Sequence, residues 1–301
     1  MNNKNLLVSF SGGETSAFMA QWLNRHYEDL GYNNIVFVFA NTGLENEQTL
    51  EFIERCDKHF KLNVQWIETE VIHQVGKGSY YYHTNFNDAS RKGEPFEEVI
   101  KKYGIPDMVN PFCTRELKSV PISKFGKQYF NGEKYDTAIG IRQDEIDRIN
   151  PNFRDKNFIY PLAMDNMIPV TKPMINFYWK QMPFRLELKG YQGNCATCWK
   201  KGDAKLFQIY KENPSAFDFM IRMEKDYGNF IPESRKEKRI KEGKDIPNRM
   251  TFFRNNRSAL DIIEQAKNWN GIVKNDAENY NYQIDLLGGE SCEIWSECNN
   301  E

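Results

Sequence analysis

Residues 6–16, with the sequence LLVSFSGGETS, decide the fold class of this chain. A short apolar run ends in a Ser-Gly-Gly turn, and residues 17–23 then carry apolar side chains at helical spacing. A strand that turns through two glycines into a helix forms an anion site, because the first helical N–H groups lack partners inside the helix. The glycines let an oxyanion approach the backbone closely, and hydroxyl groups add donors. The sequence therefore predicts a phosphate site on Ser11, Gly12, Gly13, Thr15 and Ser16.

The order of the apolar runs predicts an α/β fold. Runs at residues 34–40, 64–67 and 136–140 are typical of buried parallel strands, and segments with helical spacing lie between them. Such alternation predicts a doubly wound parallel sheet, in which ligands bind at the carboxyl ends of the strands. Residues 73–112 are expected to be irregular, apart from a short helix at 96–103.

Composition argues against several classes of protein. A net charge of −2 over 301 residues gives no global attraction to nucleic acid. Six unevenly spaced cysteines are typical of reduced thiols or metal ligands rather than of a secreted disulfide scaffold. The N-terminus does not resemble a signal peptide, and no segment has the roughly 20 apolar residues that span a bilayer. We therefore expect a cytoplasmic protein that does not contact a membrane.

The second signal is a C-x-x-C pair, Cys195 and Cys198, which places two thiolates within reach of one metal ion or cluster. A tetrahedral zinc ion or an iron–sulfur cubane needs three or four ligands, and Cys113 is the natural third. It lies at a predicted helix start beside basic residues, where the thiolate is favoured. Cys292 or Cys298 could complete a set of four. A [4Fe–4S] cluster, a zinc ion (Zn²⁺) and free thiols remain open as interpretations.

Several motifs carry a resemblance to a known family. The Ser-Gly-Gly loop resembles the S-G-G-x-[DT]-S loop of the PP-loop ATP pyrophosphatases. Four later segments resemble motifs of the phosphoadenosine phosphosulfate (PAPS) reductase-like branch, in the order of that branch. They are N-T-G-x-E at residues 41–45, C-T-x-x-L-K-x-x-P at 113–121, G-x-R-x-[DE]-[ES]-x-x-R at 140–148, and YPL with PMI at 160–162 and 173–175.

The chain thus resembles the PAPS reductase-like family of the PP-loop (adenine nucleotide alpha hydrolase-like) superfamily over roughly residues 6–200. The resemblance implies a HUP-like, Rossmann-type nucleotide-binding domain, which we place at residues 1–175. The strand–helix alternation stops further along the chain, so we predict a mainly helical C-terminal subdomain at 176–301 that carries the C-x-x-C pair.

One departure from the family decides between its branches. The sulfonucleotide reductases alter the Ser-Gly-Gly loop and carry Glu-Cys-Gly-Leu-His near the C-terminus. This chain keeps the loop, and no glycine or histidine follows Cys298. The resemblance therefore implies that ATP is cleaved to adenylate a substrate with release of pyrophosphate, in sulfur transfer (thiolation). A PAPS or APS reductase and a non-catalytic nucleotide-binding module remain as alternatives.

The resemblance also implies roles for individual residues. ATP and Mg²⁺ are the expected ligands, and Asn41, Thr42 and Gly43 would border the adenosine. Arg142, Lys118 and Arg148 would meet phosphate charge, since a guanidinium suits paired oxygen contacts. Asp144 or Glu145 would hold Mg²⁺. Arg142, Asp144 and Lys118 are the residues that we expect to act in catalysis. Relatives that pair a cysteine in the C-T-x-x-L-K segment with a later C-x-x-C include holders of a [4Fe–4S] cluster.

The resemblance leaves open a nucleic-acid substrate and a sulfur donor protein as partners, beside the small-molecule nucleotide. Residues 234–244 are rich in lysine and arginine and could contact a phosphate backbone, with Phe252 and Phe253 as stacking partners. A solvated helix and a pair of core aromatics are the competing interpretations.

Overall fold

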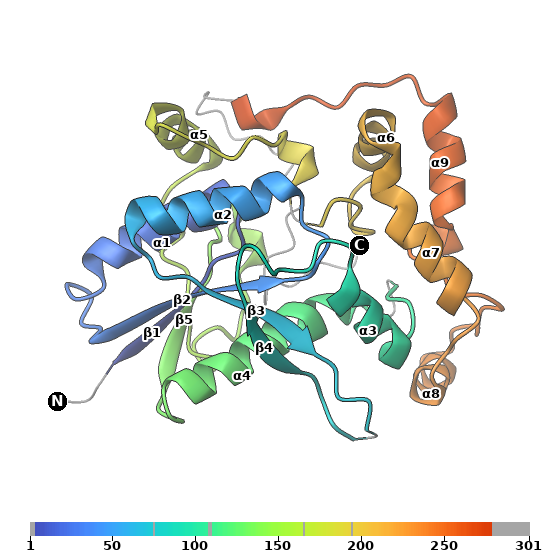
Figure 1. Ribbon diagram of the computed structural model, residues 1–301, viewed down its shortest axis with the longest axis horizontal. Helices are drawn as coiled ribbons and strands as arrows, with labels where there is room; N and C mark the ends of the chain where they lie inside the picture. Colours follow the sequence, from blue (N-terminus) through green and yellow to red (C-terminus); the bar gives the residue numbers. More distant parts are fainter. Residues whose placement is uncertain (1–3, 75, 108–109, 165, 194, 279–301) are drawn as a thin grey trace.

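The structure is a computed structural model that describes residues 4–74, 76–107, 110–164, 166–193 and 195–278. Its centre is a six-stranded sheet with the strand order β4-β3-β2-β1-β5-β6 (Figure 1). The strands are β1 (Asn5–Ser9), β2 (Asn34–Asn41), β3 (Gln65–Glu70), β4 (Tyr80–Thr84), β5 (Tyr135–Ala138) and β6 (Phe158–Ile159). All neighbours pair in parallel except β3 and β4, which are antiparallel.

The helices follow the strands in the order that the sequence predicts. They are α1 (Glu14–His26), α2 (Glu47–Phe60), α3 (Glu94–Tyr103), α4 (Val120–Tyr129), α5 (Lys172–Gln181), α6 (Asp203–Glu212), α7 (Asp218–Tyr227), α8 (Glu233–Lys241) and α9 (Ala259–Asn268). The expected α/β fold with a central, mostly parallel sheet is confirmed.

Both faces of the sheet are covered, because neighbouring side chains on a strand point to opposite faces. Leu6 and Val8 pack into a core shared with residues of α1 and α2. Leu7 of the same strand, with Val38 of β2, packs instead against Ile122 of α4. Figure 1 shows α1 and α2 on one side of the sheet and α4 on the other. The unbroken apolar runs of β1 and β2 follow from this double cover.

A second apolar cluster lies beside the sheet and joins α3 to α6, α7 and α9. Phe96 of α3, Phe219 of α7 and Ile262 of α9 belong to it. The boundary that we placed after residue 175 falls inside α5, whose Ile175 and Trp179 pack in the core of α1 and α2. The division into residues 1–175 and 176–301 stays a prediction.

Two elements differ from the sequence prediction. The expectation that residues around 80 are irregular is wrong, since Tyr80–Thr84 forms the edge strand β4. Its run of tyrosines lacks the apolar repeat of a buried strand, because an edge strand leaves polar groups exposed. The helix that we expected from residue 119 is preceded by a π-helical turn at Arg115–Ser119.

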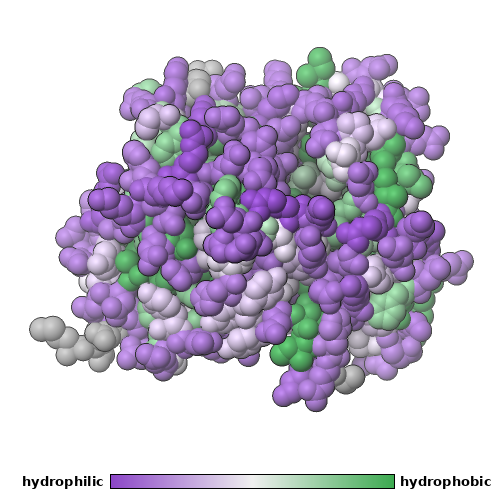
Figure 2. All heavy atoms as spheres, viewed as in Figure 1, coloured by the Kyte–Doolittle hydropathy of each residue, from purple (hydrophilic) through white to green (hydrophobic). Residues whose placement is uncertain are grey.

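The face of the molecule in Figure 2 is mainly hydrophilic, and its apolar residues gather in small separate groups. Within the described residues, no helix is both long enough and apolar enough to cross a bilayer.

Candidate nucleotide site and cysteine cavity

The loop from β1 to α1 uses its two glycines differently. Gly12 has a φ of +84°, and a Cβ there would lie 2.7 Å from Cγ2 of Thr49 and 2.8 Å from Cδ1 of Ile53. Gly12 is therefore required for packing against α2. Gly13 is the N-cap of α1 with a φ of −88°, and no atom lies within 4 Å of a Cβ built there. The space beside the helix N-terminus is open at Gly13.

Hydroxyl groups hold the loop in shape. Ser11 Oγ donates a hydrogen bond to Ser16 Oγ at 3.0 Å, and Ser16 Oγ donates to the carbonyl of Gly13 at 3.0 Å. The chain after β5 passes close to this turn, since a Cβ on Gly140 would lie 3.3 Å from the Cα of Ser16. The N-terminus of α1 therefore sits against the carboxyl ends of β1 and β5.

Arg142 places a buried cation at the same loop. Its Nη1 donates to Oγ1 of Thr15 at 3.1 Å, and its Nε donates to Oδ1 of Asp144 at 2.9 Å. Glu145 contacts Arg142 at 3.1 Å and Arg148 at 2.6 Å. The structure thus brings the predicted residues Thr15, Arg142, Asp144 and Arg148 into one network.

The acidic residue nearest the loop is neutralised from another element. Glu14 is buried, and Arg185 pairs with it at 3.1 Å. Burial raises the pKa of the Glu14 carboxyl, and the charge of Arg185 opposes that rise. The indole Nε1 of Trp179 donates to the Glu14 carbonyl at 2.9 Å. Helix α5 and the segment after it therefore support the start of α1.

The side chain of Asn41 organises the end of β2. Its Nδ2 donates to Glu68 at 2.6 Å and to the carbonyl of Ser90 at 2.9 Å, and its Oδ1 accepts from the Gly43 amide at 3.2 Å. Gly43 has a φ of +80°, and a Cβ there would lie 3.0 Å from the Cα of Gly93. The expected contact of Asn41 and Gly43 with adenosine stays a prediction, and it concerns their backbone because the Asn41 side chain is fully buried.

Thr42 and Lys118 meet on a buried carboxylate. Glu45 accepts hydrogen bonds from the Thr42 amide at 3.0 Å and the Thr42 hydroxyl at 2.9 Å, and Lys118 Nζ lies 3.7 Å away. Both Glu45 and Lys118 are buried. Burying a charge is costly unless it is paired, so each of these two groups offsets the cost of burying the other.

The loop after β2 is joined directly to the C-x-x-C segment. Glu45 and Cys195 form an antiparallel bridge, and the Ala196 amide donates to the Leu44 carbonyl at 3.0 Å. Oγ1 of Thr42 also lies 3.5 Å from Sγ of Cys195. The cysteine pair is thereby held against the carboxyl edge of the sheet.

A buried ammonium group shapes the C-x-x-C segment itself. Lys201 Nζ donates to the carbonyls of Tyr191, Gly193 and Ala196 at 3.1, 2.8 and 3.2 Å. Burial lowers the pKa of Lys201 to about 8. Three carbonyl acceptors on one ammonium tie the residues before and between the cysteines into a compact turn.

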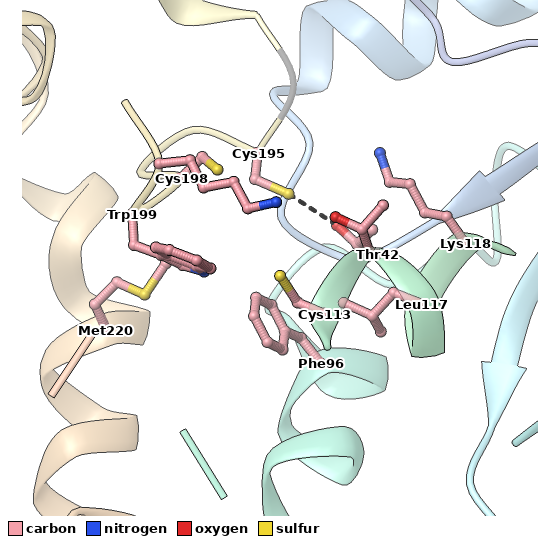
Figure 3. A pocket seen from close by; sticks show the side chains of 11 residues that line it. Thr42, Phe96, Cys113, Leu117, Lys118, Cys195, Cys198, Trp199 and Met220 are labelled. Atoms are coloured by element: carbon pink, nitrogen blue, oxygen red, sulfur yellow. Dashed lines mark hydrogen bonds between the residues drawn. The ribbon is translucent and has the colours of Figure 1, made fainter. Parts of the chain in front are cut away.

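The three predicted cysteines line one cavity, to which five segments of the chain contribute (Figure 3). Cys113 comes from the segment before the π-helical turn, and Cys195 and Cys198 come from the C-x-x-C turn opposite. Burial and the neighbouring Glu45 raise the pKa of the Cys195 thiol to about 12. The cavity is lined by Thr42, Phe96, Cys113, Thr114, Leu117, Lys118, Cys195, Cys198, Trp199, Lys200 and Met220.

The thiols share a cavity without surrounding a single point. Within the described part of the chain, no three His, Cys, Asp or Glu side chains are grouped closely enough to hold one metal ion. The candidate fourth ligands, Cys292 and Cys298, lie outside the described residues. Cys56 is buried in the core of α2, as its apolar surroundings in the sequence predict.

Of the two interpretations of Phe252 and Phe253, the structure fits core aromatics and not a stacking surface for nucleic acid. Phe252 and Phe253 are buried in the second apolar cluster, so their rings are not available to stack on bases. In the basic stretch, Arg235 and Arg239 of α8 are buried and pair with Asp107. The competing interpretation, core aromatics and a helix with one solvated face, fits these residues.

Three residues of the site were not among those predicted. Glu45 lies in the N-T-G-x-E motif, and its acidic side chain was the available signal. Trp199 and Lys201 follow Cys198 directly, but the C-x-x-C pattern counts only thiols. Their roles depend on packing that no spacing rule describes.

Comparison with known proteins agrees with the fold. Residues 5–110 match the family model of the phosphoadenosine phosphosulfate reductase domain. An uncharacterized nin region protein of Escherichia phage lambda is 34% identical over 203 residues, which is 66% of this chain and 67% of that protein. The chain therefore belongs to the PAPS reductase-like family, within the PP-loop ATP pyrophosphatase superfamily.

Two further relatives are uncharacterized proteins of Methanocaldococcus jannaschii. They are 26% identical over 179 residues and 27% identical over 129 residues, or 60% and 42% of this chain. The matches span 30% and 24% of the length of those two proteins. Membership of this family indicates that the protein binds a nucleotide.

Proposed function

We propose that the protein binds ATP at the carboxyl edge of the sheet and adenylates an acceptor with release of pyrophosphate. A sulfide from a separate sulfur donor then displaces AMP from the activated acceptor. The observation that carries this proposal is the bridge between Glu45 and Cys195. It holds the cysteine cavity against the loop that follows β2, so a nucleotide at the strand ends would lie beside the thiols.

The β1–α1 loop supports the phosphate part of the proposal. The open space at Gly13 adjoins the N-terminus of α1, where free amides and the helix dipole favour an anion. Arg142 already contacts Thr15 in this loop and can turn its guanidinium to phosphate oxygens. Catalysis would rest on positioning and on stabilisation of charge, so no protein nucleophile is required.

Magnesium is part of the proposal because a bare triphosphate resists attack at its α-phosphate. Asp144 and Glu145 are the carboxylates that would hold Mg²⁺. Asp144 now accepts from Arg142 and from the Lys172 amide, so Mg²⁺ would take over part of these contacts. Arg142 would be released toward the phosphates by the same exchange.

We favour an iron–sulfur cluster over a single zinc ion in this cavity. A tetrahedral zinc ion binds its sulfurs at about 2.3 Å, which requires the thiolates to surround one point. The three thiols instead line the wall of a shared cavity. We infer that Cys113, Cys195 and Cys198 would hold a [4Fe–4S] cluster. With three protein ligands, the cluster supplies one iron that is open to a sulfur ligand.

Anaerobic purification followed by two assays tests the proposal. Iron and acid-labile sulfide are measured first, and pyrophosphate release from ATP is then followed with candidate acceptors, nucleic acid included. We expect iron to be bound and pyrophosphate release to depend on the acceptor. Release of sulfite from PAPS or adenylyl sulfate would identify a reductase instead, and ATP binding without turnover would identify a binding module.

ATP and reduced thiols together point to the cytoplasm as the site of the reaction.

A further inference from the structure

One buried donor in the cysteine cavity has no acceptor. The side chain of Trp199 is buried, and its Nε1 makes no hydrogen bond to any residue that the structure describes. The buried indole of Trp179, by contrast, donates to the Glu14 carbonyl at 2.9 Å. Buried polar groups are almost always paired, so an unpaired donor beside a cavity indicates an acceptor that binds there.

The position of the indole defines where that acceptor would sit. Trp199 lines the cavity together with the three cysteines, and Figure 3 shows its ring along one wall with the nitrogen on the side of Cys113. The side chains around it are Phe96, Leu117 and Met220, which offer no strong acceptor. Thr42 and Thr114 also line the cavity, but neither hydroxyl accepts from this indole, so a group bound in the cavity would complete its pairing.

The charges on the cavity wall indicate what kind of acceptor fits. Lys200 Nζ lies 5.4 Å from the centroid of the Trp199 ring, and Lys118 also lines the cavity. An N–H donor and the Lys200 ammonium, beside the Lys118–Glu45 pair, favour a group that carries negative charge. The sulfur atoms of an iron–sulfur cluster meet this requirement, since they are anionic and accept N–H hydrogen bonds.

We propose that Trp199 Nε1 donates a hydrogen bond to a sulfur atom of the cluster held by Cys113, Cys195 and Cys198. The inference rests on the cluster of the proposed function and assigns Trp199 as a positioning residue for it. Such a bond stabilises the reduced, more negative form of a cluster and raises its reduction potential. Trp199 would thereby set the potential of the cluster without being one of its ligands.

The test compares cluster properties in reconstituted full-length protein. Trp199→Phe removes the donor and keeps an aromatic ring, while Trp66→Phe makes the same change at a buried tryptophan outside the cavity. Iron content and midpoint potential are measured for both variants and the unmodified protein, with the potential from a redox titration followed by electron paramagnetic resonance. We expect equal iron, a more negative potential for Trp199→Phe, and an unchanged potential for Trp66→Phe.

A second measurement does not depend on the variant folding. In the unmodified protein, ¹⁵N in the tryptophan indoles should give a nuclear coupling to the reduced cluster in pulsed electron paramagnetic resonance. An iron-bound protein with no such coupling, or an unchanged potential in iron-bound Trp199→Phe, overturns the role of Trp199 alone. Failure of the unmodified protein to take up iron overturns the cluster and this inference together.

Discussion

At the scale of single residues, the structure gives different roles to Gly12 and Gly13, the two glycines of the β1–α1 loop. They are adjacent in the sequence, and both were predicted to bind phosphate. Gly12 serves the fold, because its Cβ position is filled by Thr49 and Ile53 of α2. Gly13 faces open space. The sequence could not separate them, since the neighbours of Gly12 lie about 40 positions away in the chain.

Gly13→Val should abolish ATP binding and leave the melting temperature nearly unchanged. The side chain would occupy the open space at the start of α1, where the phosphates are proposed to bind. Gly202→Val is the matched control, because Gly202 is also a helix N-cap with no atom within 4 Å of its Cβ position. Calorimetry with ATP is the measurement, and unchanged affinity in folded Gly13→Val would contradict the loop assignment.

Gly12→Val is expected to act through stability instead. Valine at a φ of +84° is strained, and its side chain would collide with Thr49 and Ile53. We expect a fall in the melting temperature of more than 5 °C, read by circular dichroism. A variant as stable as the unmodified protein would show that α2 can move away from the loop.

Arg142→Ala should weaken binding of ATP much more than binding of adenosine. A hydrogen bond to a charged group contributes roughly 1.5–3 kcal/mol, which corresponds to a loss of about 10- to 150-fold in affinity. Titration calorimetry with both ligands separates the phosphate contact from a general loss of structure. Arg257→Ala, which breaks a pair with Asp203 at 2.8 Å, serves as the control. Equal losses for ATP and adenosine would place Arg142 away from the phosphates.

At the scale of elements, the spacing of apolar residues along the sequence was enough to predict β1, β2, α2 and α3. It failed at β4 and at the π-helical turn for physical reasons. An edge strand such as Tyr80–Thr84 needs no alternating apolar pattern. Its register is set by its pairing with β3, which the local sequence does not show. A π-helical turn holds more residues than an α-helical turn, but the amino-acid composition of the segment does not reveal it. Here it precedes α4 and carries Lys118 toward Glu45.

Helix α8 shows how a basic sequence can serve the interior. Asp107 pairs with Arg235 at 3.0 Å and also with Arg239, and both arginines are buried. Burial lowers the pKa of Arg235, and Asp107 opposes that effect. Spacing along the sequence could not show which members of residues 234–244 point inward, because their partner lies in another part of the chain.

Asp107→Asn should lower the free energy of unfolding by roughly 3 kcal/mol, since two buried guanidinium groups lose their counter-charge. Chemical denaturation followed by fluorescence measures the change. Glu233→Gln is the control, because its pair with Lys236 at 3.0 Å is exposed and contributes less than about 1 kcal/mol. Similar losses in the two variants would show that the buried pairs do not hold α8 in place.

At the scale of the whole molecule, the cysteine cavity depends on segments that are far apart in the chain. Its three thiols could be predicted because one lies in a family motif and two form C-x-x-C. The bridge between Glu45 and Cys195 could not, since a single antiparallel contact leaves no pattern in the sequence. The donor role of Trp199 depends on the same packing.

Changing Cys113, Cys195 or Cys198 singly to Ser should cause the same loss of bound iron. Each thiol lines the one cavity, and a cluster with three ligands is destabilised by loss of any of them. Iron analysis and the visible absorbance of anaerobically purified protein give the readout. Cys56→Ser is the control, because Cys56 packs in the core of α2 and should leave the iron content unchanged. An unchanged iron content in Cys113→Ser, together with no iron in Cys195→Ser, would show that the three cysteines do not hold one cluster.

The bridge between the loop after β2 and the C-x-x-C turn also affects the order in which the protein folds. Thr42 and Cys195 are 153 positions apart, and the entropy cost of closing so long a loop is repaid only when one end is already fixed. The parallel pairing of β1 with β2 fixes Thr42, because it needs only the first part of the chain. When Cys113 has emerged from the ribosome but the C-x-x-C segment has not, the cysteine cavity is thus not yet assembled. Uptake of the proposed cluster would therefore wait until the C-x-x-C segment has emerged and docked on the finished sheet.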